Sequence, residues 1–262
     1  MTTGSSFNSR PPPLHPAPTV RLVDASLVYD QTVLFDHLSV DICSSGWTVL
    51  LGPSGVGKTT LLRLVAGLET NAEGRAESDD GRPLEGRISY MAQQDLLLPW
   101  LSLRQNALLG ARLRRKNSAL LETRADDLLK KAGLASAVDL MPSACSGGMR
   151  QRAALVRTLM EDRPIVLMDE PFSALDAITR LQLQDIAADL LSQRTVLLVT
   201  HDPLEALRLG HWIHVMTGRP ARLGDAIIPD GPPPRQVSDP NLSKLQAGLL
   251  TELAEAARET SI

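Results

Sequence analysis

The chain of 262 residues is long enough for one large domain or two small lobes, and it can bury a core without disulfides or metal ions. Its net charge is −3, which argues against a nucleic-acid partner. No run reaches the roughly 18 apolar residues that a membrane-spanning helix requires, so a soluble, cytoplasmic protein is expected. The two cysteines, Cys43 and Cys145, lack the spacing of paired metal ligands and indicate a reducing compartment.

A tail and three strands come first in chain order. Residues 1–19 are proline-rich and lack an apolar export signal, so they are expected to form a disordered tail. Residues 20–29 alternate as in a half-buried strand, and residues 33–43 and 47–51 are expected to form the next two strands. The third strand runs directly into a glycine-rich loop.

This glycine-rich loop carries the strongest chemical signal in the chain. Residues 52–59 read GPSGVGKT and match the pattern G-x-x-x-x-G-K-[ST] in full. Glycines let backbone N–H groups converge on phosphate oxygens, Lys58 can reach the outer phosphates, and Thr59 can ligate magnesium. A helix over residues 59–68 would point its positive end at the anion. The alternative is a glycine turn that only caps this helix. The expected nucleotide contacts are Gly52, Pro53, Ser54, Gly55, Val56, Gly57, Lys58, Thr59 and Thr60.

The middle of the chain changes from strand to helix. The polar, glycine-bearing stretch 71–86 is expected to form surface turns before a strand at residues 87–92. Between residues 103 and 160 the pattern becomes helical, and residues 120–132 carry apolar side chains at helical spacing. The region of about 94–160 is therefore expected to be a helical lobe inserted into the core.

Strands return in the second half of the chain. They are expected at residues 165–168 and 195–200, with a helix over residues 177–193 between them. Strands that alternate with helices predict an α/β fold with a parallel sheet. The first of these strands ends in Asp169 and Glu170. Beside the phosphate loop, Asp169 suits magnesium and Glu170 could polarise an attacking water, although a solvated strand end is the alternative interpretation.

A second anion-binding helix end is predicted at residues 145–152, which read CSGGMRQR. Ser146 is a good N-cap, and Gly147 and Gly148 allow close approach to an anion; an ordinary helix start is the alternative.

With these motifs in this order, the chain resembles the ATP-binding subunits of ABC transporters, whose signature loop is usually written L-S-G-G-Q. The resemblance covers residues 20–257. It implies a P-loop NTPase core of the RecA type with an inserted α-helical subdomain.

The resemblance assigns roles to further residues. Tyr29 stands where the family places an aromatic ring against adenine, and Gln93 matches the glutamine that senses magnesium and the γ-phosphate, with Gln94 as an alternative register. Residues 173–176 resemble the loop that crosses between two nucleotide sites, and His201 resembles the switch histidine. The metal ligands are then expected to be Thr59, Gln93 and Asp169, and the catalytic residues Glu170, His201 and Gln93. The remaining nucleotide contacts are expected to be Tyr29, Ser146, Gly147, Gly148, Met149 and Asp176.

Two positions depart from the family pattern. Cys145 stands where leucine is common, and Met149 stands where glutamine is frequent, although methionine is familiar there in importers. A thiol at a helix N-terminus has a lowered pKa if it is exposed. A buried free cysteine behaves instead as a small hydrophobic residue, which is the favoured interpretation of Cys145.

The resemblance also implies an assembly. In the family each ATP lies between the phosphate loop of one subunit and the signature helix of another, so a head-to-tail dimer with two Mg²⁺–ATP sites is expected. A monomer is then expected to bind nucleotide and hydrolyse it poorly. Further expected partners are an integral membrane permease and, through it, an extracytoplasmic substrate-binding protein. The expected location is the cytoplasmic face of the cell membrane.

Three classes of function compete. The motor of an importer is favoured, since exporters usually fuse their membrane segments to the motor. A soluble ABC ATPase of DNA repair or translation would carry a long coiled coil or tandem cassettes, and a small-molecule kinase would not need the segment SGGMRQR. The permease is expected to contact residues 93–101.

The cargo is expected to be small and organic or anionic. The segment DLLLPW and the C-terminal tail resemble the nitrate, sulfonate and taurine importer branch, and MAQQDLLLPW most resembles its transporters of the thiamine pyrimidine precursor, hydroxymethylpyrimidine. The expected domain limits are 20–220 for the ATP-binding domain and 221–262 for a proline-rich connector and a C-terminal helix.

Overall fold

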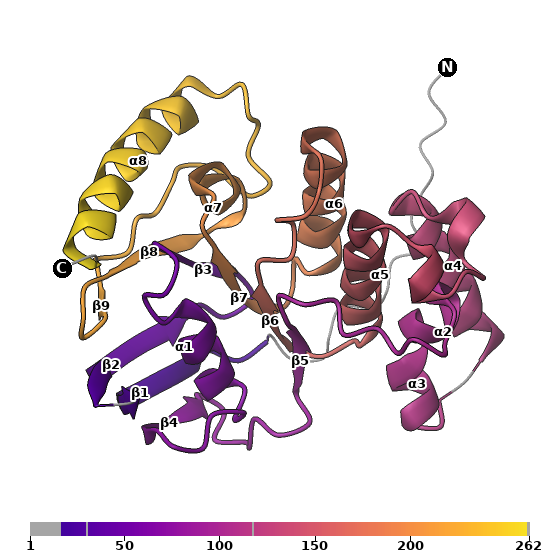
Figure 1. Cartoon of the computed structure of the whole chain (residues 1–262), viewed down its shortest axis with the longest axis horizontal. Helices are drawn as coiled ribbons and strands as arrows, with labels where there is room; N and C mark the ends of the chain where they lie inside the picture. Colours follow the sequence, from indigo (N-terminus) through magenta and orange to yellow (C-terminus); the bar gives the residue numbers. More distant parts are fainter. Residues whose placement is uncertain (1–16, 30, 117, 261–262) are drawn as a thin grey trace.

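Two sheets and a set of flanking helices make up the computed structural model, which describes residues 17–29, 31–116 and 118–260 (Figure 1). The central sheet has six strands in the order β5-β6-β7-β3-β8-β9, and a three-stranded sheet has the order β2-β1-β4. The central strands are β3 (Trp47–Leu51), β5 (Ile88–Met91), β6 (Ile165–Asp169), β7 (Thr195–Thr200), β8 (Trp212–Thr217) and β9 (Arg222–Leu223). The smaller sheet consists of β1 (Val20–Tyr29), β2 (Thr32–Ile42) and β4 (Glu73–Ser78), all antiparallel.

The central sheet is covered on both faces. Alternate residues of β6 enter different cores: Val166 and Met168 pack among the helices, whereas Ile165 and Leu167 pack against β1, β2 and α1. Burial on both faces explains why β3, β6 and β7 are buried at every position and mostly apolar instead of alternating. Strands β5, β6, β7, β3 and β8 are parallel, so their carboxyl ends share one edge of the sheet. Loops that follow β3, β6 and β7 therefore meet at that edge.

The helices form two groups. Helix α1 (Lys58–Val65) lies between the two sheets, with its buried residues in the core that it shares with β1 and β2. On the other face lie α5 (Gly147–Met160), α6 (Ala177–Leu190), α7 (Pro203–Leu209) and α8 (Pro240–Thr260). Among the described residues, no helix has both the length and the apolar character needed to cross a bilayer.

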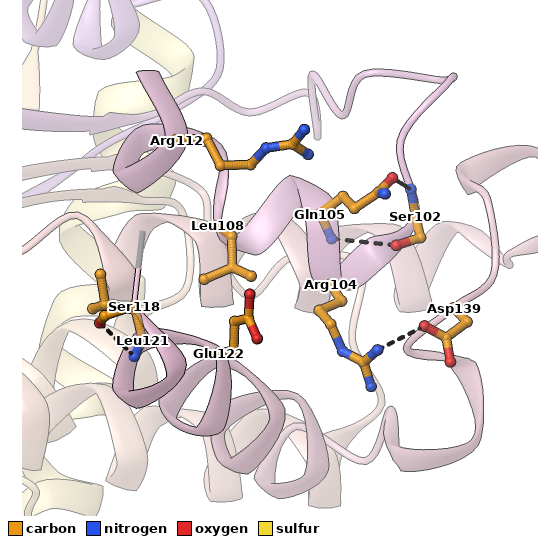
Figure 2. A pocket seen from close by; sticks show the side chains of 9 residues that line it. All are labelled: Ser102, Arg104, Gln105, Leu108, Arg112, Ser118, Leu121, Glu122 and Asp139. Atoms are coloured by element: carbon orange, nitrogen blue, oxygen red, sulfur yellow. Dashed lines mark hydrogen bonds and ion pairs between the residues drawn. The ribbon is translucent and has the colours of Figure 1, made fainter. Parts of the chain in front are cut away.

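The helical subdomain lies at the end of the molecule opposite β1 and β2 (Figure 1). It contains α2 (Leu103–Ala107), α3 (Leu109–Leu113) and α4 (Ala119–Lys131), which pack against α5. Helix α2 begins with a capping box in which the Ser102 hydroxyl accepts from the Gln105 N–H and the Gln105 side chain accepts from the Ser102 N–H (Figure 2). The Ser118 hydroxyl caps α4 by accepting from the Leu121 N–H, so local hydrogen bonds fix both helix starts.

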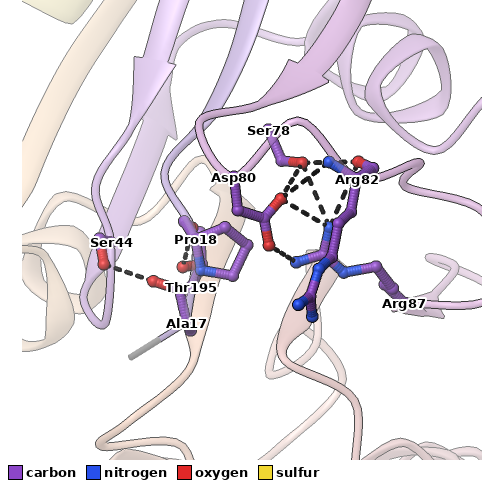
Figure 3. Close-up of polar contacts among 8 residues, drawn as sticks. All are labelled: Ala17, Pro18, Ser44, Ser78, Asp80, Arg82, Arg87 and Thr195. Atoms are coloured by element: carbon purple, nitrogen blue, oxygen red, sulfur yellow. Dashed lines mark hydrogen bonds and ion pairs between the residues drawn. The ribbon is translucent and has the colours of Figure 1, made fainter. Parts of the chain in front are cut away.

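The N-terminal boundary differs from the expected one. Of the expected tail, residues 1–16 lie outside the described part of the chain, but Ala17 and Pro18 are buried against the core. The Ser44 hydroxyl donates to the Ala17 carbonyl, and the Thr195 hydroxyl donates to the Pro18 carbonyl at 2.6 Å (Figure 3). The two donors lie far along the chain from Ala17 and Pro18. Composition alone could not show these contacts, so it placed the boundary of the tail at residue 19.

The predicted α/β fold with an inserted helical subdomain is confirmed, and one local prediction is wrong. The stretch 71–86 contains β4, which pairs with β1 as an edge strand, because backbone pairing outweighs its polar composition there. Helix α7 and strands β8 and β9 were not anticipated. The core also continues past residue 220, since Ala221 is buried and Ile227 pairs with Ile213.

Candidate nucleotide site

The loop between β3 and α1 needs glycine for its shape. Gly55 and Gly57 have positive φ angles of 81° and 109°, which other residues adopt only with strain. A Cβ atom on Gly52 would lie 2.5 Å from the Met216 carbonyl oxygen, and one on Gly57 would lie 3.0 Å from the ring of Phe35. Glycine at these two positions therefore lets the loop pack closely against β8 and β2, where a side chain would clash.

Lys58 begins α1 and is almost fully buried, with 6% of its surface exposed. Its Nζ atom donates to the carbonyl oxygens of Gly52 and Pro53, each at 2.8 Å. Burial lowers the pKa of Lys58, and the charges of Glu170 and Asp169 oppose this shift. The lysine is thus held inside the loop by two of the loop's own carbonyls, at the helix end that favours anions.

A pocket of about 360 Å³ opens over this loop. Its lining comes from segments that are far apart in sequence, and Gln93, not Gln94, belongs to it. The side chain of Val56 is fully buried in the core, so only its backbone is available there. The lining residues are Tyr29, Leu34, Ser54, Gly55, Gly57, Lys58, Thr59, Thr60, Gln93 and Glu170.

Asp169 ends β6 beside this loop, and its surroundings suit a metal ligand. It is 1% exposed, and neither carboxylate oxygen accepts a hydrogen bond of ordinary geometry from the described residues. Burial raises the pKa of Asp169, while the Thr59 hydroxyl and the charge of Lys58 oppose this shift. Buried oxygens without partners are costly unless a cation or donor compensates them. A carboxylate and a nearby hydroxyl are hard oxygen ligands of the kind that Mg²⁺ prefers.

Glu170 follows Asp169 and makes a contact with His201, the residue after β7. The His201 Nδ1 atom lies 3.0 Å from the Glu170 Oε1 atom. Glu170 has a left-handed backbone with φ of 47°, held by a 2.9 Å hydrogen bond from its N–H to the Val199 carbonyl. A non-glycine residue in this conformation is strained, and such strain concentrates at functional positions. Its carboxylate is thereby directed into the pocket and oriented by an imidazole.

The helix end at Ser146 is well formed but lies outside this pocket. The Ser146 hydroxyl accepts from the Met149 N–H at 3.3 Å and caps α5. None of the residues 146–149 lines the pocket over the phosphate loop. Asp176 likewise caps α6, where the Thr179 N–H lowers the pKa of its carboxyl. One chain therefore brings together the phosphate loop, Gln93, Asp169, Glu170 and His201, but not these two helix ends.

Cys145 is 7% exposed and belongs to the core that the helices share. Its thiol donates to the Met141 carbonyl at 3.4 Å. Burial raises the pKa of Cys145 although Arg150 lies nearby. Of the two interpretations of this residue, the small apolar one agrees with its position.

Sequence reasoning missed two residues that support the site. Leu34 of β2 lines the pocket, and its apolar character gave no signal of this. Gln151 of α5 is buried, and its amide donates long hydrogen bonds of 3.5 and 3.4 Å to the carbonyls of Glu170 and Pro171. It thus joins the start of α5 to the loop after β6. Its burial is a property of the structure, and the sequence showed only a polar residue one turn into that helix.

A second cavity, of about 410 Å³, lies on the helical subdomain (Figure 2). Arg104 lies at its wall and pairs with Asp126 at 2.6 Å and with Asp139 at 2.9 Å. Two arginines and two acidic residues give this helical-subdomain groove a mixed charge. Its lining residues are Ser102, Arg104, Gln105, Leu108, Arg112, Ser118, Leu121, Glu122 and Asp139.

Comparison with known proteins agrees with this geometry. Residues 35–173 match the family model described as ABC transporter. A protein of Haemophilus influenzae described as an uncharacterized ABC transporter ATP-binding protein is 45% identical, over 89% of this chain and 98% of its own length. The aliphatic sulfonates import ATP-binding protein SsuB 1 of Pseudomonas savastanoi pv. phaseolicola is 39% identical, over 89% of this chain and 95% of its own length.

Solved structures point to the same family. The dimeric post-hydrolysis state of the ATP-binding cassette MJ0796 bound to ADP and Pi is 27% identical, with a TM-score of 0.70 over 81% of this chain and 99% of that one. A putative metal-chelate type ABC transporter in an inward-facing conformation, 22% identical with a TM-score of 0.66, shares the fold. The chain belongs to the ABC transporter family, as one of its ATP-binding and ATP-hydrolysing subunits.

Proposed function

We propose that the chain is the motor subunit of an ABC importer and works as a head-to-tail pair. One observation carries the paired arrangement: the pocket over the phosphate loop is assembled within one chain, whereas the second anion-binding helix end, at Ser146, lies outside it. A second copy could bring that helix end to the pocket. The similar cassette solved as a dimer with ADP and Pi supports this arrangement.

Within the pair, each residue of the pocket has a proposed role. Backbone N–H groups of residues 52–60 hold the phosphates, Lys58 neutralises the outer ones, and Tyr29 stacks on adenine. Glu170 polarises the attacking water, and His201 orients Glu170 and contacts the γ-phosphate. The second copy contributes Ser146, Gly147, Gly148, Met149 and Asp176.

Thr59, Gln93 and Asp169 would hold Mg²⁺, and the partnerless oxygens of Asp169 support this assignment. The ion would supply charge neutralisation between the phosphates. Gln93 and Thr59 face the pocket from separate segments, the loop after β5 and helix α1. The nucleotide would therefore tie the start of the helical subdomain to the core. Release of that tie after hydrolysis would let the pair reopen.

The permease is proposed to dock on the helical subdomain at the cytoplasmic face of the membrane. Leu96 and Trp100 are exposed by 58% and 68%, and Leu140 and Met141 are partly exposed on the neighbouring segment. The Leu103 N–H donates to the Leu140 carbonyl, which places the two segments side by side next to the helical-subdomain groove. A short amphipathic helix could cover these side chains and meet the charged wall of the groove.

Crosslinking tests this contact. Cysteines placed at residues 96 and 100 should crosslink to a co-expressed permease, and a cysteine placed at an exposed position of β4, such as Glu73, should not. Crosslinks from β4 with none from the loop would refute the docking surface.

The cargo is proposed to be a small organic or anionic solute, with aliphatic sulfonates as the first candidate. Several relatives at 38–40% identity are described as aliphatic sulfonates import proteins. Taurine, nitrate and hydroxymethylpyrimidine are the other candidates of the same branch. The motor does not contact the cargo, so the relatives carry this assignment and the pocket does not.

The assembled transporter tests the function. The chain, its permease and the extracytoplasmic binding protein are reconstituted in nanodiscs, and ATPase is measured with each candidate solute. Stimulation by one solute identifies the cargo. Failure of the chain to co-purify with any membrane protein, with ATPase retained, would favour the alternative, a non-transport ABC ATPase.

A further inference from the structure

Arg180 lies in the first turn of α6 and connects two loops that border the nucleotide site. Its Nη1 atom donates to the Asp202 Oδ2 atom at 3.0 Å, and its Nη2 atom donates to the Leu175 carbonyl at 3.0 Å. The side chains of Arg180 and Asp202 are 30% and 27% exposed, so the pair is partly shielded from water. A charge-assisted contact of this kind is stronger than one between neutral groups.

Both ends of this link lead back to Glu170. On one side, the Ser173 hydroxyl in the same loop as Leu175 donates to the Glu170 carbonyl at 3.0 Å. On the other side, Asp202 follows His201, whose ring contacts the Glu170 carboxylate at 3.0 Å. These six residues therefore form a closed ring around the loop after β6.

Asp202 also fixes the backbone next to His201. Its Oδ1 atom accepts from the N–H groups of Leu204 and Glu205, at 2.9 and 3.3 Å, and so caps α7. One carboxylate thus holds the start of α7 with one oxygen and Arg180 with the other. The guanidinium of Arg180 also lies near the buried carboxyl of Glu205, so its positive charge faces two acidic side chains, Asp202 and Glu205.

We propose that Arg180 is a positioning residue that couples the loop at residues 173–176 to the contact between His201 and Glu170. This inference rests on the proposed function, since in the paired arrangement that loop faces the second nucleotide site. When the second copy displaces the loop, the Leu175 carbonyl moves Arg180, and Asp202 moves His201. The two sites would thereby sense each other through Arg180 and Asp202, neither of which contacts a nucleotide.

The experiment measures ATPase of the full chain for Arg180→Ala, Arg180→Lys and Asp202→Asn. Arg180→Ala should lower kcat about tenfold, because a displaced catalytic group loses rate out of proportion to the shift. KM, and ATP binding measured in a Glu170→Gln background, should change less than about threefold, since no binding group is removed. The Hill coefficient for ATP should fall toward about 1.

Two variants separate coupling from simple stability. Arg180→Lys keeps the charge but cannot span Asp202 and Leu175 with a fork, so its kcat should lie between those of wild type and Arg180→Ala. Asp202→Asn keeps the α7 cap through its amide oxygen, and the double variant with Arg180→Ala should be no slower than the single one. If Arg180→Ala does not fold, kcat and the Hill coefficient of Arg180→Lys and Asp202→Asn test the coupling instead.

Arg87→Ala is the matched control. Arg87 is also a partly buried, multiply bonded arginine: it binds Asp80 at 2.6 Å and contacts Ser78 and the Arg82 carbonyl (Figure 3). It precedes β5, and its carbonyl accepts from the Ile165 N–H at the start of β6, so it lies at the opposite edge of the sheet from Glu170. This variant should lower thermal stability without changing kcat or the Hill coefficient.

The inference is overturned if Arg180→Ala keeps wild-type kcat and Hill coefficient, or if Arg87→Ala of equal thermal stability reduces kcat as much. It is also overturned if the effects of Arg180→Ala and Asp202→Asn add fully. A wild-type chain without ATPase, or with a Hill coefficient of about 1 at all protein concentrations, contradicts the proposed function itself. The two failures are therefore distinguishable.

Discussion

The pocket over the phosphate loop and the helix end at residues 146–149 differ in how completely their polar groups are satisfied. At the pocket, neither Asp169 oxygen accepts a hydrogen bond of ordinary geometry within the described part of the chain, and Glu170 has a left-handed backbone. At the helix end, Ser146 caps α5 and neighbouring Cys145 is buried in the core. The first region contains backbone strain and unpaired carboxylate oxygens, which a bound ligand would stabilise. In the second region the polar groups are already hydrogen-bonded, so the helix end is ready to bind an anion on another surface.

The largest expected effect lies in the pocket. Glu170→Gln keeps the shape of the side chain but removes the base, so kcat should fall by about 10²–10⁴-fold. ATP binding should be retained, since no phosphate contact is lost. A quenched time-course ATPase assay measures kcat, and equilibrium nucleotide binding measures the affinity for ATP. Glu77→Gln on the edge strand β4 is the control. Undiminished turnover would remove Glu170 from the mechanism.

Mixing two damaged chains tests whether the two regions meet between copies. Lys58→Ala damages the pocket and Ser146→Arg damages the helix end, so each variant alone should have little ATPase. A mixed pair regains one intact site, and an equal mixture should recover about a quarter of the wild-type rate, because half of the pairs are mixed and each has one of two sites. The measurement is ATPase against mixing ratio at constant total protein.

An absence of recovery in the mixture, with both variants folded and paired, would mean that each chain carries its own complete site. Concentration-independent ATPase of a proven monomer would lead to the same conclusion. Either outcome would show that the nucleotide site is not divided between the pocket of one copy and the helix end of another.

Buried charge near the pocket should also show in the pH dependence of stability. Burial raises the pKa of Glu205 to about 8, with Asp202 and Glu170 adding to the shift and Arg180 and Thr200 opposing it. The folded chain keeps this proton where the unfolded chain loses it, so the free energy of unfolding falls as pH rises from about 4.5 to 8. Glu205→Gln should remove this slope and stabilise the protein at pH 8 by on the order of 4 kcal/mol.

Urea unfolding at pH 5, 6.5 and 8 measures this slope. The difference between the variant and wild type should be smallest at pH 5, just above the ordinary glutamate pKa of 4.5 at which Glu205 loses its proton in the unfolded chain. A wild-type curve that is parallel to that of Glu205→Gln over this range would contradict the raised pKa. Glu77→Gln, on the exposed strand β4, controls for the loss of a charge.

The smallest effect is expected at the helix end. Cys145→Ala removes a buried sulfur and should cost about 1 kcal/mol of stability with little change in kcat. Because burial raises its pKa, native Cys145 should alkylate slowly at neutral pH and quickly in urea. Peptide mapping after timed iodoacetamide treatment measures both rates. Rapid native labelling would revive the alternative of a reactive thiol beside an anion-binding helix.

Local patterns predicted much of this protein because local chemistry decides those features. The loop at residues 52–59 requires glycines and a lysine in fixed positions, and the strand that ends in Asp169 is apolar because both of its faces are buried. Predictions failed where pairing across the chain decided the outcome. Strand β4 is polar and exists because β1 pairs with it, and β8 adds to the sheet beside β3.

The sequence by itself determined the family resemblance, the phosphate loop and the order of the motifs. Only the tertiary structure decided which groups meet: that Gln93 and not Gln94 lines the pocket, that His201 reaches Glu170, and that Arg180 joins two loops. The physical reason is that a parallel sheet gathers the ends of strands far apart in sequence at one edge. Spacing along the chain carries no record of those contacts.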